Sequence, residues 1–535
     1  MKNKLSSPNQ PSRRQFLKKA SAATGVAIGA GLTATCAVQA LPQPSALPSK
    51  WDLSADVVVI GSGIAGMSAA ITALDLGGSV TVLEKSENYG GCAIINGGIL
   101  SLGGGTRTQR ENGIEDTPEL LFKKLTDPTH PDYRKNDPKL VRHYAQVCPT
   151  TQEWLEEHGV TFLPTFTKPG EYDSQHHESY HHIGWKDPGE GNRKPQPSGG
   201  FMTGRGIMMP YYEWFTSKGG EILMQHRATQ VYQDANGRAV GVCVETPDGV
   251  KSIQAKRGVV LAGGGWKANR KLRTLTDPRF GENMPSTGYP FVEPDGSAIQ
   301  LGMKAGAMYV GDRGEDTPHL RRMFGTNRYG FPRGSKYGCP GIDVKGPRWA
   351  EVIFTNKNGD RFIREEDKAN LGGYSFYDIA LAQPEQLLWC IFDDATAKNF
   401  RWTIESPQCE EGYAFKAETL EDLANLTNQP NLVKTTHAYN GFVESKKDTE
   451  FSKPEELLTK KIEQGPFYAV RLVLFVHNLT GGLYINENAQ VLNTNGDVIP
   501  ALYAAGETAG GLYVGNGMPR GIMPGRFAGE HIMKS

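Results

Sequence analysis

Residues 56–66 read Asp-Val-Val-Val-Ile-Gly-Ser-Gly-Ile-Ala-Gly, an apolar run that leads into three glycines. The continuous β-branched run predicts a buried parallel strand. The residues that follow, Met67 to Leu76, predict a helix, and a second strand from Ser79 to Leu83 ends at Glu84. A strand, a Gly-x-Gly-x-x-Gly turn, a helix and a strand ending in an acid together indicate a dinucleotide-binding βαβ unit.

The three glycines have separate physical tasks in such a unit. Gly61 permits the tight turn, Gly63 lets the backbone approach a pyrophosphate, and Gly66 lets the helix and strand pack closely. The pyrophosphate is expected at the helix N-terminus beside Ala65, where free N–H groups and the helix dipole favour an anion. Glu84 lies 23 positions after Gly61, close to the spacing of a carboxylate that binds a ribose.

Composition and charge exclude several classes of function. Lys plus Arg equals Asp plus Glu, 58 each among 535 residues, so no basic field indicates nucleic-acid binding. The seven cysteines include no CxxC or CxxCH spacing, which excludes the usual haem-c and zinc-ribbon patterns. The histidines of residues 165–200, His181 among them, lie between glycines and prolines; we expect an irregular, solvated segment there and predict no metal site.

The first forty residues predict an export signal. Residues 1–40 carry six basic residues and no acidic one, with Arg13-Arg14 followed by an Ala/Gly-rich run from Ala20 to Ala37. This arrangement resembles a twin-arginine signal, ended by the small-residue sequence Val38-Gln39-Ala40 and followed by a linker at 41–51. Beyond it no run of about 18 apolar residues occurs, so we predict a periplasmic protein without a membrane span.

Three further segments extend the dinucleotide pattern. Tyr89-Gly90-Gly91-Cys92 and Asn96-Gly97-Gly98 place glycines just past the ribose acid. Residues 255–265 form another strand that runs into Ala-Gly-Gly-Gly, and residues 499–507 form a strand that ends in Gly-Glu.

With these motifs the chain resembles the fumarate reductase and succinate dehydrogenase flavoprotein superfamily. It is more closely similar to the soluble branch that includes flavocytochrome-c fumarate reductases, urocanate reductase and 3-ketosteroid dehydrogenases. The resemblance extends from about residue 52 to 531 and includes Pro294-Asp295-Gly296 and the block from Tyr503 to Gly529. It implies an α/β fold: a Rossmann-like FAD-binding domain, 52–310 and 477–535, with an inserted α+β capping domain, 311–476.

The resemblance also implies a set of FAD contacts spread over several loops. Glycines and Cys92 would lie along the isoalloxazine, Val231 on the adenine side, Glu507 at the ribitol, and backbone N–H groups of residues 521–524 near the pyrimidine ring. No histidine occupies residues 90–98, where membrane-complex members attach FAD covalently, so we expect non-covalent FAD. The expected FAD-contacting residues are Gly61, Gly63, Ala65, Gly66, Glu84, Lys85, Gly91, Cys92, Gly97, Gly98, Val231, Ala262, Gly263, Asp295, Glu507, Gly521 and Ile522.

At the reacting site the chain departs from the fumarate reductases. Their two carboxylate-binding arginines fall, by motif, at Glu366, directly before an Asp-Lys pair, and at Leu512, 13 positions before Gly525. A dicarboxylate would lose both bidentate partners, which a closed site cannot readily replace. The residue counts therefore argue against fumarate as the substrate.

Other side chains take over the expected roles. Tyr513 resembles the tyrosine that hydrogen-bonds a carbonyl in ketosteroid dehydrogenases, and His477 resembles the family's substrate-binding histidine. We predict Tyr513, His477 and Arg520 as the catalytic set, with Tyr374 or Tyr377 as a possible proton donor from the cap.

The resulting hypothesis is an exported FAD-dependent oxidoreductase. A hydride would pass between flavin N5 and an activated carbon–carbon bond of a small enone or enoate, and electrons would be exchanged with a separate partner, a c-type cytochrome or a quinone-linked protein. Two alternatives stay open. One is a fumarate or other dicarboxylate reductase with relocated arginines, Arg364 and Arg520, and the other is a flavin electron-transfer subunit.

Overall fold

The computed structural model describes the chain in thirteen stretches. These are residues 47–128, 136–167, 179–185, 201–202, 204–276, 286, 294–310, 324–328, 350–365, 376–399, 414–476, 481–514 and 517–535. The predicted export signal lies outside the described residues.

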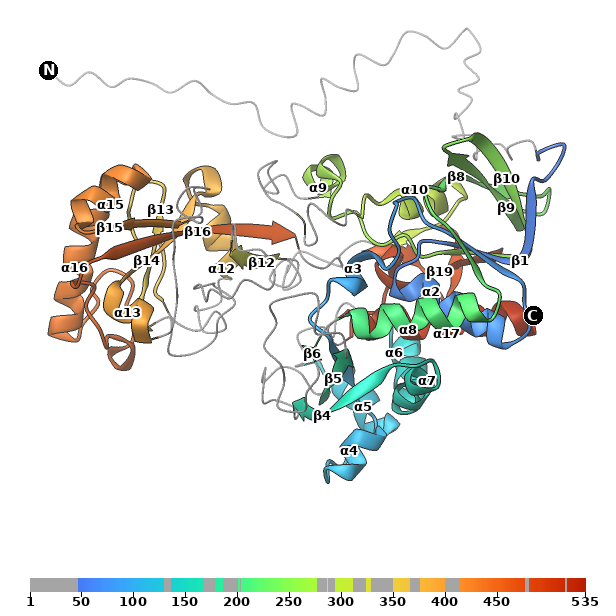
Figure 1. Cartoon of the computed structure of the whole chain (residues 1–535), viewed down its shortest axis with the longest axis horizontal. Helices are drawn as coiled ribbons and strands as arrows, with labels where there is room; N and C mark the ends of the chain where they lie inside the picture. Colours follow the sequence, from blue (N-terminus) through green and yellow to red (C-terminus); the bar gives the residue numbers. More distant parts are fainter. Residues whose placement is uncertain are drawn as a thin grey trace, which may run out of the picture. The chain divides into compact units, whose positions relative to one another are not determined.

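A largely parallel sheet forms the frame of the predicted FAD-binding part (Figure 1). The strands β19, β10, β1, β2 and β7 run parallel, while β18, β9 and β8 join antiparallel to their neighbours. The sheet order is β18 (Gln490–Leu492), β19 (Val498–Ala504), β10 (Gly249–Leu261), β1 (Leu53–Ile60), β2 (Val80–Leu83) and β7 (Glu221–Leu223), with β9 (Ala239–Thr246) and β8 (Arg227–Gln233) continuing from β10. The predicted α/β class is confirmed, although β10 begins six residues earlier than its apolar pattern suggests.

The register explains why the apolar runs are continuous. Val59 on β1 pairs with Val260 on one side and with Val82 on the other, and all three are fully buried. A strand covered on both faces has no polar side, so its sequence does not alternate.

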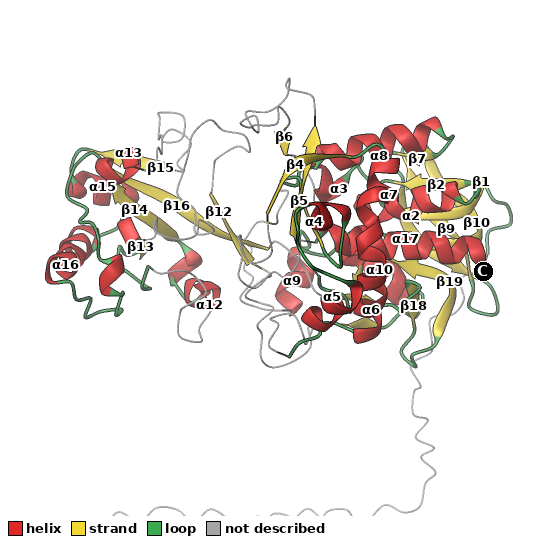
Figure 2. Ribbon diagram, turned by 90° about the horizontal axis from the view of Figure 1, so that it is seen from below, coloured by secondary structure: helices red, strands yellow, loops and turns green. Residues whose placement is uncertain are grey.

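Two helices, both labelled in Figure 2, pack on this sheet and against each other with their backbones unusually close. Helix α2 (Ile64–Asp75) follows the glycine turn, and α17 (Met518–Lys534) is the last element of the chain. The glycines of α17 at 521, 525 and 529 lie one turn apart and so share one face. A Cβ at any of them would collide with the first turns of α2 or with its carbonyl oxygens, so only glycine allows this packing.

A smaller antiparallel sheet corrects one prediction. It consists of β3 (Ile99–Leu102), β5 (Ser179–Trp185), β4 (Thr161–Thr167) and β6 (Phe201–Met202). The predicted irregular segment at 165–200 therefore contains strands, and its His181 is buried rather than solvated, with Nε2 3.0 Å from the Thr106 hydroxyl. The glycines and prolines that suggested a loop do not prevent strand pairing on either side of them.

The remaining elements of this part surround the two sheets. They are α3 (Gly91–Ile94), α4 (Arg107–Glu111), α5 (Pro118–Leu125), α6 (Pro138–Val147), η2 (Cys148–Thr150), α7 (Thr151–Glu157), α8 (Arg205–Ser217), α9 (Arg270–Thr276), α10 (Ser297–Lys304), η6 (Gly506–Thr508) and a sheet of β11 (Tyr309–Val310), β17 (Gly482–Tyr484) and β20 (Ala509–Gly510). β11 pairs with β17, so the chain before residue 311 and the chain after residue 476 meet in one sheet. The exact domain boundaries stay a prediction.

The residues between them form a second α+β assembly. Its sheet holds β12 (Phe324–Arg328), β16 (Phe467–Val476), β14 (Leu388–Asp393), β13 (Ile353–Asn356) and β15 (Ala414–Ala417), with α12 (Phe376–Leu381), η4 (Pro384–Gln386), α13 (Asp394–Asn399), α15 (Leu420–Thr427), α16 (Leu432–Ser445) and η5 (Glu455–Leu457). It has a core of its own, in which Ile353, Ile391, Leu423 and Leu458 are fully buried.

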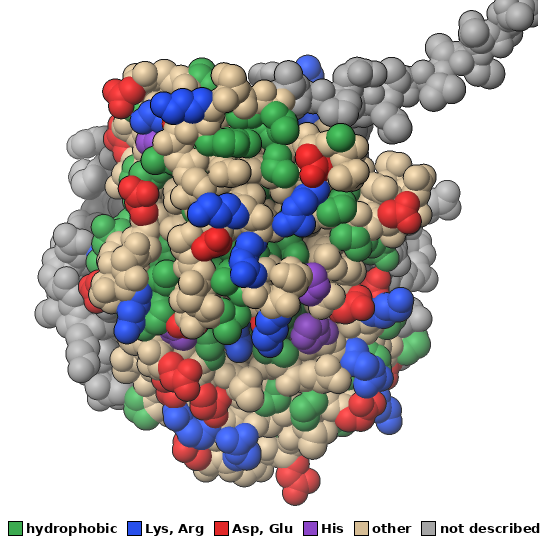
Figure 3. Space-filling view, turned by 90° about the vertical axis from the view of Figure 1, so that its right-hand side faces the viewer, with side chains coloured by type: hydrophobic (Ala, Val, Ile, Leu, Met, Phe, Trp, Pro, Cys, Tyr) green, Lys and Arg blue, Asp and Glu red, His purple; other side chains and the backbone are tan. Residues whose placement is uncertain are grey.

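Within the described stretches no helix is both long and apolar enough to cross a membrane. On the face shown in Figure 3, positive and negative side chains are interspersed rather than gathered by sign.

Candidate active site

The glycine turn after β1 has the geometry that a dinucleotide requires. Gly61 has φ +102°, and a Cβ there would lie 2.5 Å from the carbonyl oxygen of Ala262. A Cβ at Gly66 would overlap the carbonyl oxygen of Gly61, whereas one at Gly63 would meet nothing within 4 Å. The first and third glycines are thus needed for packing, and the second faces open space where a phosphate could approach the backbone.

Loops that are far apart in sequence converge on this turn. A Cβ at Gly91 would lie 3.3 Å from Cα of Gly63, and one at Gly506 would lie 2.9 Å from Cβ of Ala65. The loops therefore meet at the carboxyl ends of β1, β10 and β19, the crevice in which open α/β sheets bind ligands.

Three predicted glycines and one predicted strand residue have no contact in the structure that assigns their role toward FAD. Gly97 has open space at its Cα, and Gly98 has φ +77° and donates its N–H to Asn96 Oδ1 at 2.8 Å. Gly263 packs against Ala298, and Val231 pairs with Val242 between β8 and β9. Their contacts with FAD stay predictions.

Glu84, the predicted ribose acid, is almost fully buried at 8% exposure and is held by two serines. Oε2 accepts hydrogen bonds from the backbone N and hydroxyl of Ser62 at 3.0 and 2.7 Å. Oε1 accepts from the backbone N and hydroxyl of Ser86 at 3.0 and 2.9 Å. A carboxylate has about four acceptor directions, so ribose hydroxyls would bind here by replacing the two serine hydroxyls.

Lys85 and Asp295 form an ion pair beside this acid. Lys85 Nζ lies 2.9 Å from one Asp295 oxygen, and Arg227 Nη2 lies 3.1 Å from the other. Burial would raise the pKa of Asp295, but the Lys85 ammonium and the hydrogen bonds from Lys85 and Ser297 hold it well below its usual range. Asp295 is thus ionised and links the residue after Glu84 to the start of β8.

A buried lysine that the sequence analysis missed lies between two predicted FAD residues. Lys267, 3% exposed, follows the glycines after β10, and its Nζ is 3.6 Å from Glu507 Oε2. Burial lowers its pKa, but the Glu507 carboxylate and the Cys92 thiol outweigh that effect and raise the pKa overall. Its place directly after a strand-to-glycine motif was the only signal in the sequence.

Tyr513 and Arg520, two of the predicted catalytic residues, lie together. Both are buried, and the Arg520 guanidinium carbon is 5.7 Å from the centre of the Tyr513 ring. Arg520 also donates to the carbonyl oxygen of Ala509 at 2.7 Å. Leu512, beside Tyr513, is buried as well. His477, the third predicted catalytic residue, lies outside the described residues, as does Tyr374.

The residues expected near the flavin pyrimidine have a packing task in the structure. Gly521 lies against Ile64, since a Cβ there would be 2.7 Å from the Ile64 side chain, and Ile522 is fully buried. Both occupy the first turns of α17, next to the start of α2. Whether their N–H groups also contact FAD stays a prediction.

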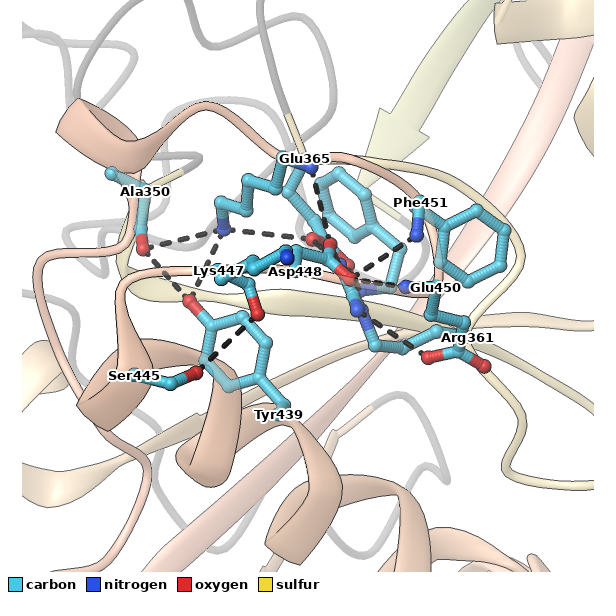
Figure 4. Close-up of polar contacts among 11 residues, drawn as sticks. Ala350, Arg361, Glu365, Tyr439, Ser445, Lys447, Asp448, Glu450 and Phe451 are labelled. Atoms are coloured by element: carbon cyan, nitrogen blue, oxygen red, sulfur yellow. Dashed lines mark hydrogen bonds and ion pairs between the residues drawn. The ribbon is translucent and has the colours of Figure 1, made fainter.

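A second cluster of charges, here called the cap cluster, lies inside the capping assembly (Figure 4). It consists of Arg361, Glu365, Asp448, Lys453 and Tyr439, all buried. Arg361 donates to Glu365 through Nε at 3.1 Å and Nη2 at 2.7 Å, and Nη2 also reaches Asp448 at 3.0 Å. Lys453 lies 3.5 Å from Glu365 and donates to the Tyr439 hydroxyl at 3.1 Å. Two cations therefore compensate the two buried carboxylates, and Arg361 Nη1 also lies 3.5 Å from the partly exposed Glu450.

The protonation states of the cap cluster follow from these pairs. Burial raises the pKa of Glu365, but Arg361 and Lys453 more than offset it and lower the pKa overall. Burial likewise opposes the hydrogen bonds from Arg361 that lower the pKa of Asp448. Both groups are carboxylates that bind cations of the same chain, so the cap cluster holds the fold of the cap and offers no open group to a substrate.

The fold and the crevice define this protein as a dinucleotide-binding protein of the α/β class. The glycine turn, the buried ribose acid and the open approach at Gly63 fit an adenine dinucleotide. A sequence profile of the FAD-binding domain family matches residues 56–519, and the chain belongs to this family. It binds FAD and is an FAD-dependent oxidoreductase.

Relatives and solved structures cover most of the chain. A fumarate reductase (cytochrome) of Shewanella frigidimarina is 28% identical over 508 residues, covering 92% of this chain and 79% of that protein. The acrylate reductase flavoprotein subunit of Shewanella woodyi is 27% identical and covers 94% and 93%. The structure of the open conformation of a flavocytochrome c3 fumarate reductase superposes with a TM-score of 0.70 at 24% identity, covering 99% and 82%. This last likeness establishes the fold alone.

Proposed function

We propose that this protein is an exported reductase that transfers a hydride to the activated carbon–carbon double bond of a small enone or monocarboxylic enoate. Its relatives carry the general reaction in their names, since fumarate and acrylate both present a double bond beside a carboxylate. FAD supplies the hydride from its N5 position when it is bound. The proposal concerns which substrates this chain accepts.

The observation that carries the proposal is the buried pair of Tyr513 and Arg520. Tyr513 has the phenol that would donate to a carbonyl oxygen, and the Arg520 guanidinium lies 5.7 Å from its ring. At the position of a fumarate-binding arginine the chain has Leu512, a buried apolar residue. One phenol and one guanidinium suit one oxygen-bearing group, whereas two carboxylates call for two cationic forks.

The residues have distinct tasks in this reaction. Tyr513 would hydrogen-bond the substrate oxygen and so stabilise the negative charge that develops there as the β-carbon accepts the hydride. Arg520 would neutralise a carboxylate or strengthen the phenol as a donor. The α-carbon then needs a proton, for which His477 and the cap tyrosines are the candidates from the sequence.

Export and electron supply complete the proposal. The Arg13-Arg14 leader supports twin-arginine export to the periplasm, and glycine-loop geometry without a histidine at 90–98 supports non-covalent FAD. Without its own haem motif, the protein would receive electrons from a c-type cytochrome or a quinone-linked protein. Replacing Arg13-Arg14 by two lysines should retain the protein in the cytoplasm, which cell fractionation measures.

The deciding experiment is anaerobic reoxidation of the dithionite-reduced, FAD-loaded protein by fumarate, urocanate, cinnamate and a 3-ketosteroid enone. Reoxidation by cinnamate or the enone, but not by fumarate, supports the proposal, and Tyr513→Phe should then lower the rate about 100-fold. Fast reoxidation by fumarate would instead support a dicarboxylate reductase that uses Arg520 and Arg364.

A further inference from the structure

Asn136 and Asp137 hold the chain segment that bears Tyr513, the tyrosine of the proposed site. Asn136 Oδ1 accepts a hydrogen bond from the backbone N of Tyr513 at 2.6 Å, and the backbone N of Asp137 donates to the Gly511 carbonyl oxygen at 2.7 Å. Two bonds two residues apart fix the short segment that bears Tyr513, although 377 positions separate Asn136 from it. The carboxamide of Asn136 is therefore a direct neighbour of the proposed substrate-polarising residue.

The other half of this carboxamide is a buried donor without an acceptor. Asn136 is 5% exposed, and its Nδ2 has no hydrogen-bond partner among the described residues. The orientation of the amide follows from its neighbour, because only the oxygen can accept the Tyr513 N–H. A buried donor left unpaired costs about 1–3 kcal/mol, and native proteins leave few such groups.

We infer that Asn136 is a further substrate-binding residue, whose Nδ2 donates to the carbonyl or carboxylate oxygen that Tyr513 also polarises. The inference rests on the proposed reductase function. The donor gains its acceptor only when the substrate is present. A ligand without an oxygen at that point leaves the donor unpaired and therefore binds more weakly. A carboxamide is neutral, so it serves a ketone as well as a monocarboxylate.

Asn136→Asp tests this without removing the structural bond. The new carboxyl has the same shape and keeps an oxygen for the Tyr513 N–H, but it replaces the donor by a second oxygen. We expect the Kd of 3-phenylpropanoate, measured from the flavin absorbance of the oxidised protein, to rise roughly 10- to 100-fold at pH 8. The KM of cinnamate should rise similarly with a smaller change in kcat.

Lowering the pH supplies a signature that a purely structural residue would not give. A protonated carboxyl regains one donor in the position of the amide, so the Kd for the Asn136→Asp variant should return toward that of the wild type as the pH falls. The neutral enone benzalacetone should lose less affinity than cinnamate at pH 8, because it has no charge to be repelled by the new carboxylate.

Tyr484→Phe is the matched control. It removes the hydroxyl that donates to Asp137 Oδ2 at 3.0 Å, in the same contact region, without touching the Asn136 amide. Its Kd for 3-phenylpropanoate should stay within twofold of the wild type. If Asn136→Asp does not fold, Asn136→Gln, which moves the donor by one methylene, should show the same loss of affinity.

The outcomes distinguish a failure of the proposed function from a failure of the role inferred for Asn136. A wild-type protein that no enone or enoate reoxidises refutes the proposed function itself. A wild-type protein that reacts, with Kd and KM unchanged in Asn136→Asp, refutes only the inference and leaves Asn136 as an anchor of Tyr513. A loss of affinity that does not recover at low pH refutes it as well, because altered folding would then explain the loss.

Discussion

The FAD crevice and the cap cluster solve the problem of a buried polar site in opposite ways. In the crevice, Gly61 and Gly66 let backbone segments pack closely because they have no side chains, and Gly63 leaves open space for the ligand. In the cap cluster, large charged side chains such as Arg361 and Lys453 satisfy one another away from water. The crevice therefore depends on space, which one methyl group destroys, and the cap cluster depends on charge balance, which one lost partner destroys.

The largest effect is expected for Gly66→Ala, which removes space needed for packing rather than space for the ligand. Gly66→Ala would place a methyl group on the Gly61 carbonyl, and an overlap with rigid backbone should destabilise the domain by more than about 3 kcal/mol. We expect little folded protein and no bound FAD, measured by thermal unfolding and flavin content.

The matched variant is Gly63→Ala, at a site with extended backbone and free space around it. It should lower the stability of the FAD-free protein by less than about 1 kcal/mol, the scale of a change at a helix N-cap, and so shift the melting temperature by only a few degrees. FAD affinity should nevertheless fall at least tenfold. Equal melting temperatures for the two variants would contradict the assignment of separate tasks.

The cap cluster should be nearly as sensitive, for the opposite reason. Arg361→Met leaves Glu365 and Asp448 without their main cation, and breaking a buried ion pair costs about 3–5 kcal/mol. Urea unfolding followed by circular dichroism measures the loss. Lys357→Met, which removes an exposed pair with Glu385, should cost less than about 1 kcal/mol; a similar loss in both variants would show that burial is unimportant here.

Lys267→Met tests whether charge balance, which holds the cap cluster, also matters in the FAD crevice. It removes a buried ammonium from Glu507 in the FAD crevice, which leaves that carboxylate without its cation. We expect FAD to bind roughly 10- to 100-fold more weakly, the worth of a hydrogen bond to a charged group, measured by fluorescence titration of the FAD-free protein. The control Lys267→Arg keeps the charge and should recover part of the affinity. No change in either variant would remove Lys267 from the cofactor site.

Lowering the pH should reduce the stability that the cap cluster contributes. The folded-state pKa values of Glu365 and Asp448 are lowered, so the unfolded chain takes up protons first, and their contribution to stability is present above about pH 4 and is lost as the pH falls through the lower folded values. The urea midpoint of the wild type should therefore fall more steeply below pH 4 than that of Arg361→Met. Parallel curves would show that the pairing with Arg361 does not set these pKa values.

The smallest expected effect comes from a partly exposed pair in the FAD-binding part. Lys85 and Asp295 are about one third exposed, so raising the salt concentration to 1 M should weaken their attraction. Asp295→Asn should lower stability by about 1 kcal/mol in low salt and by less in high salt. The cap cluster, which salt does not reach, should respond equally at both concentrations.

The sequence predicted those parts of the site whose residues lie close together along the chain, and it missed those whose residues meet only in the folded protein. The βαβ unit was readable because its strand, glycines, helix and acid lie within thirty residues and each has a local conformational reason. Lys267 and the cap cluster could not be predicted, because Arg361 pairs with Asp448, and Glu365 with Lys453, across some 87 positions or more, and a charged residue in a sequence does not show its burial. The strands at 161–185 were missed because glycine and proline signals outweighed a pairing that only neighbouring strands reveal.

The sequence by itself determined the α/β fold and the dinucleotide turn, since these depend on short-range conformational rules, and its motifs carried the resemblance to FAD-dependent oxidoreductases. Only the tertiary structure decided that α17 needs its glycines to lie on α2, that Glu84 is held by Ser62 and Ser86, and that Asn136 holds Tyr513 while its Nδ2 has no partner among the described residues. The reason is physical. Conformational preference is carried by neighbouring residues, whereas burial and partnership are properties of side chains that meet only after the chain has folded.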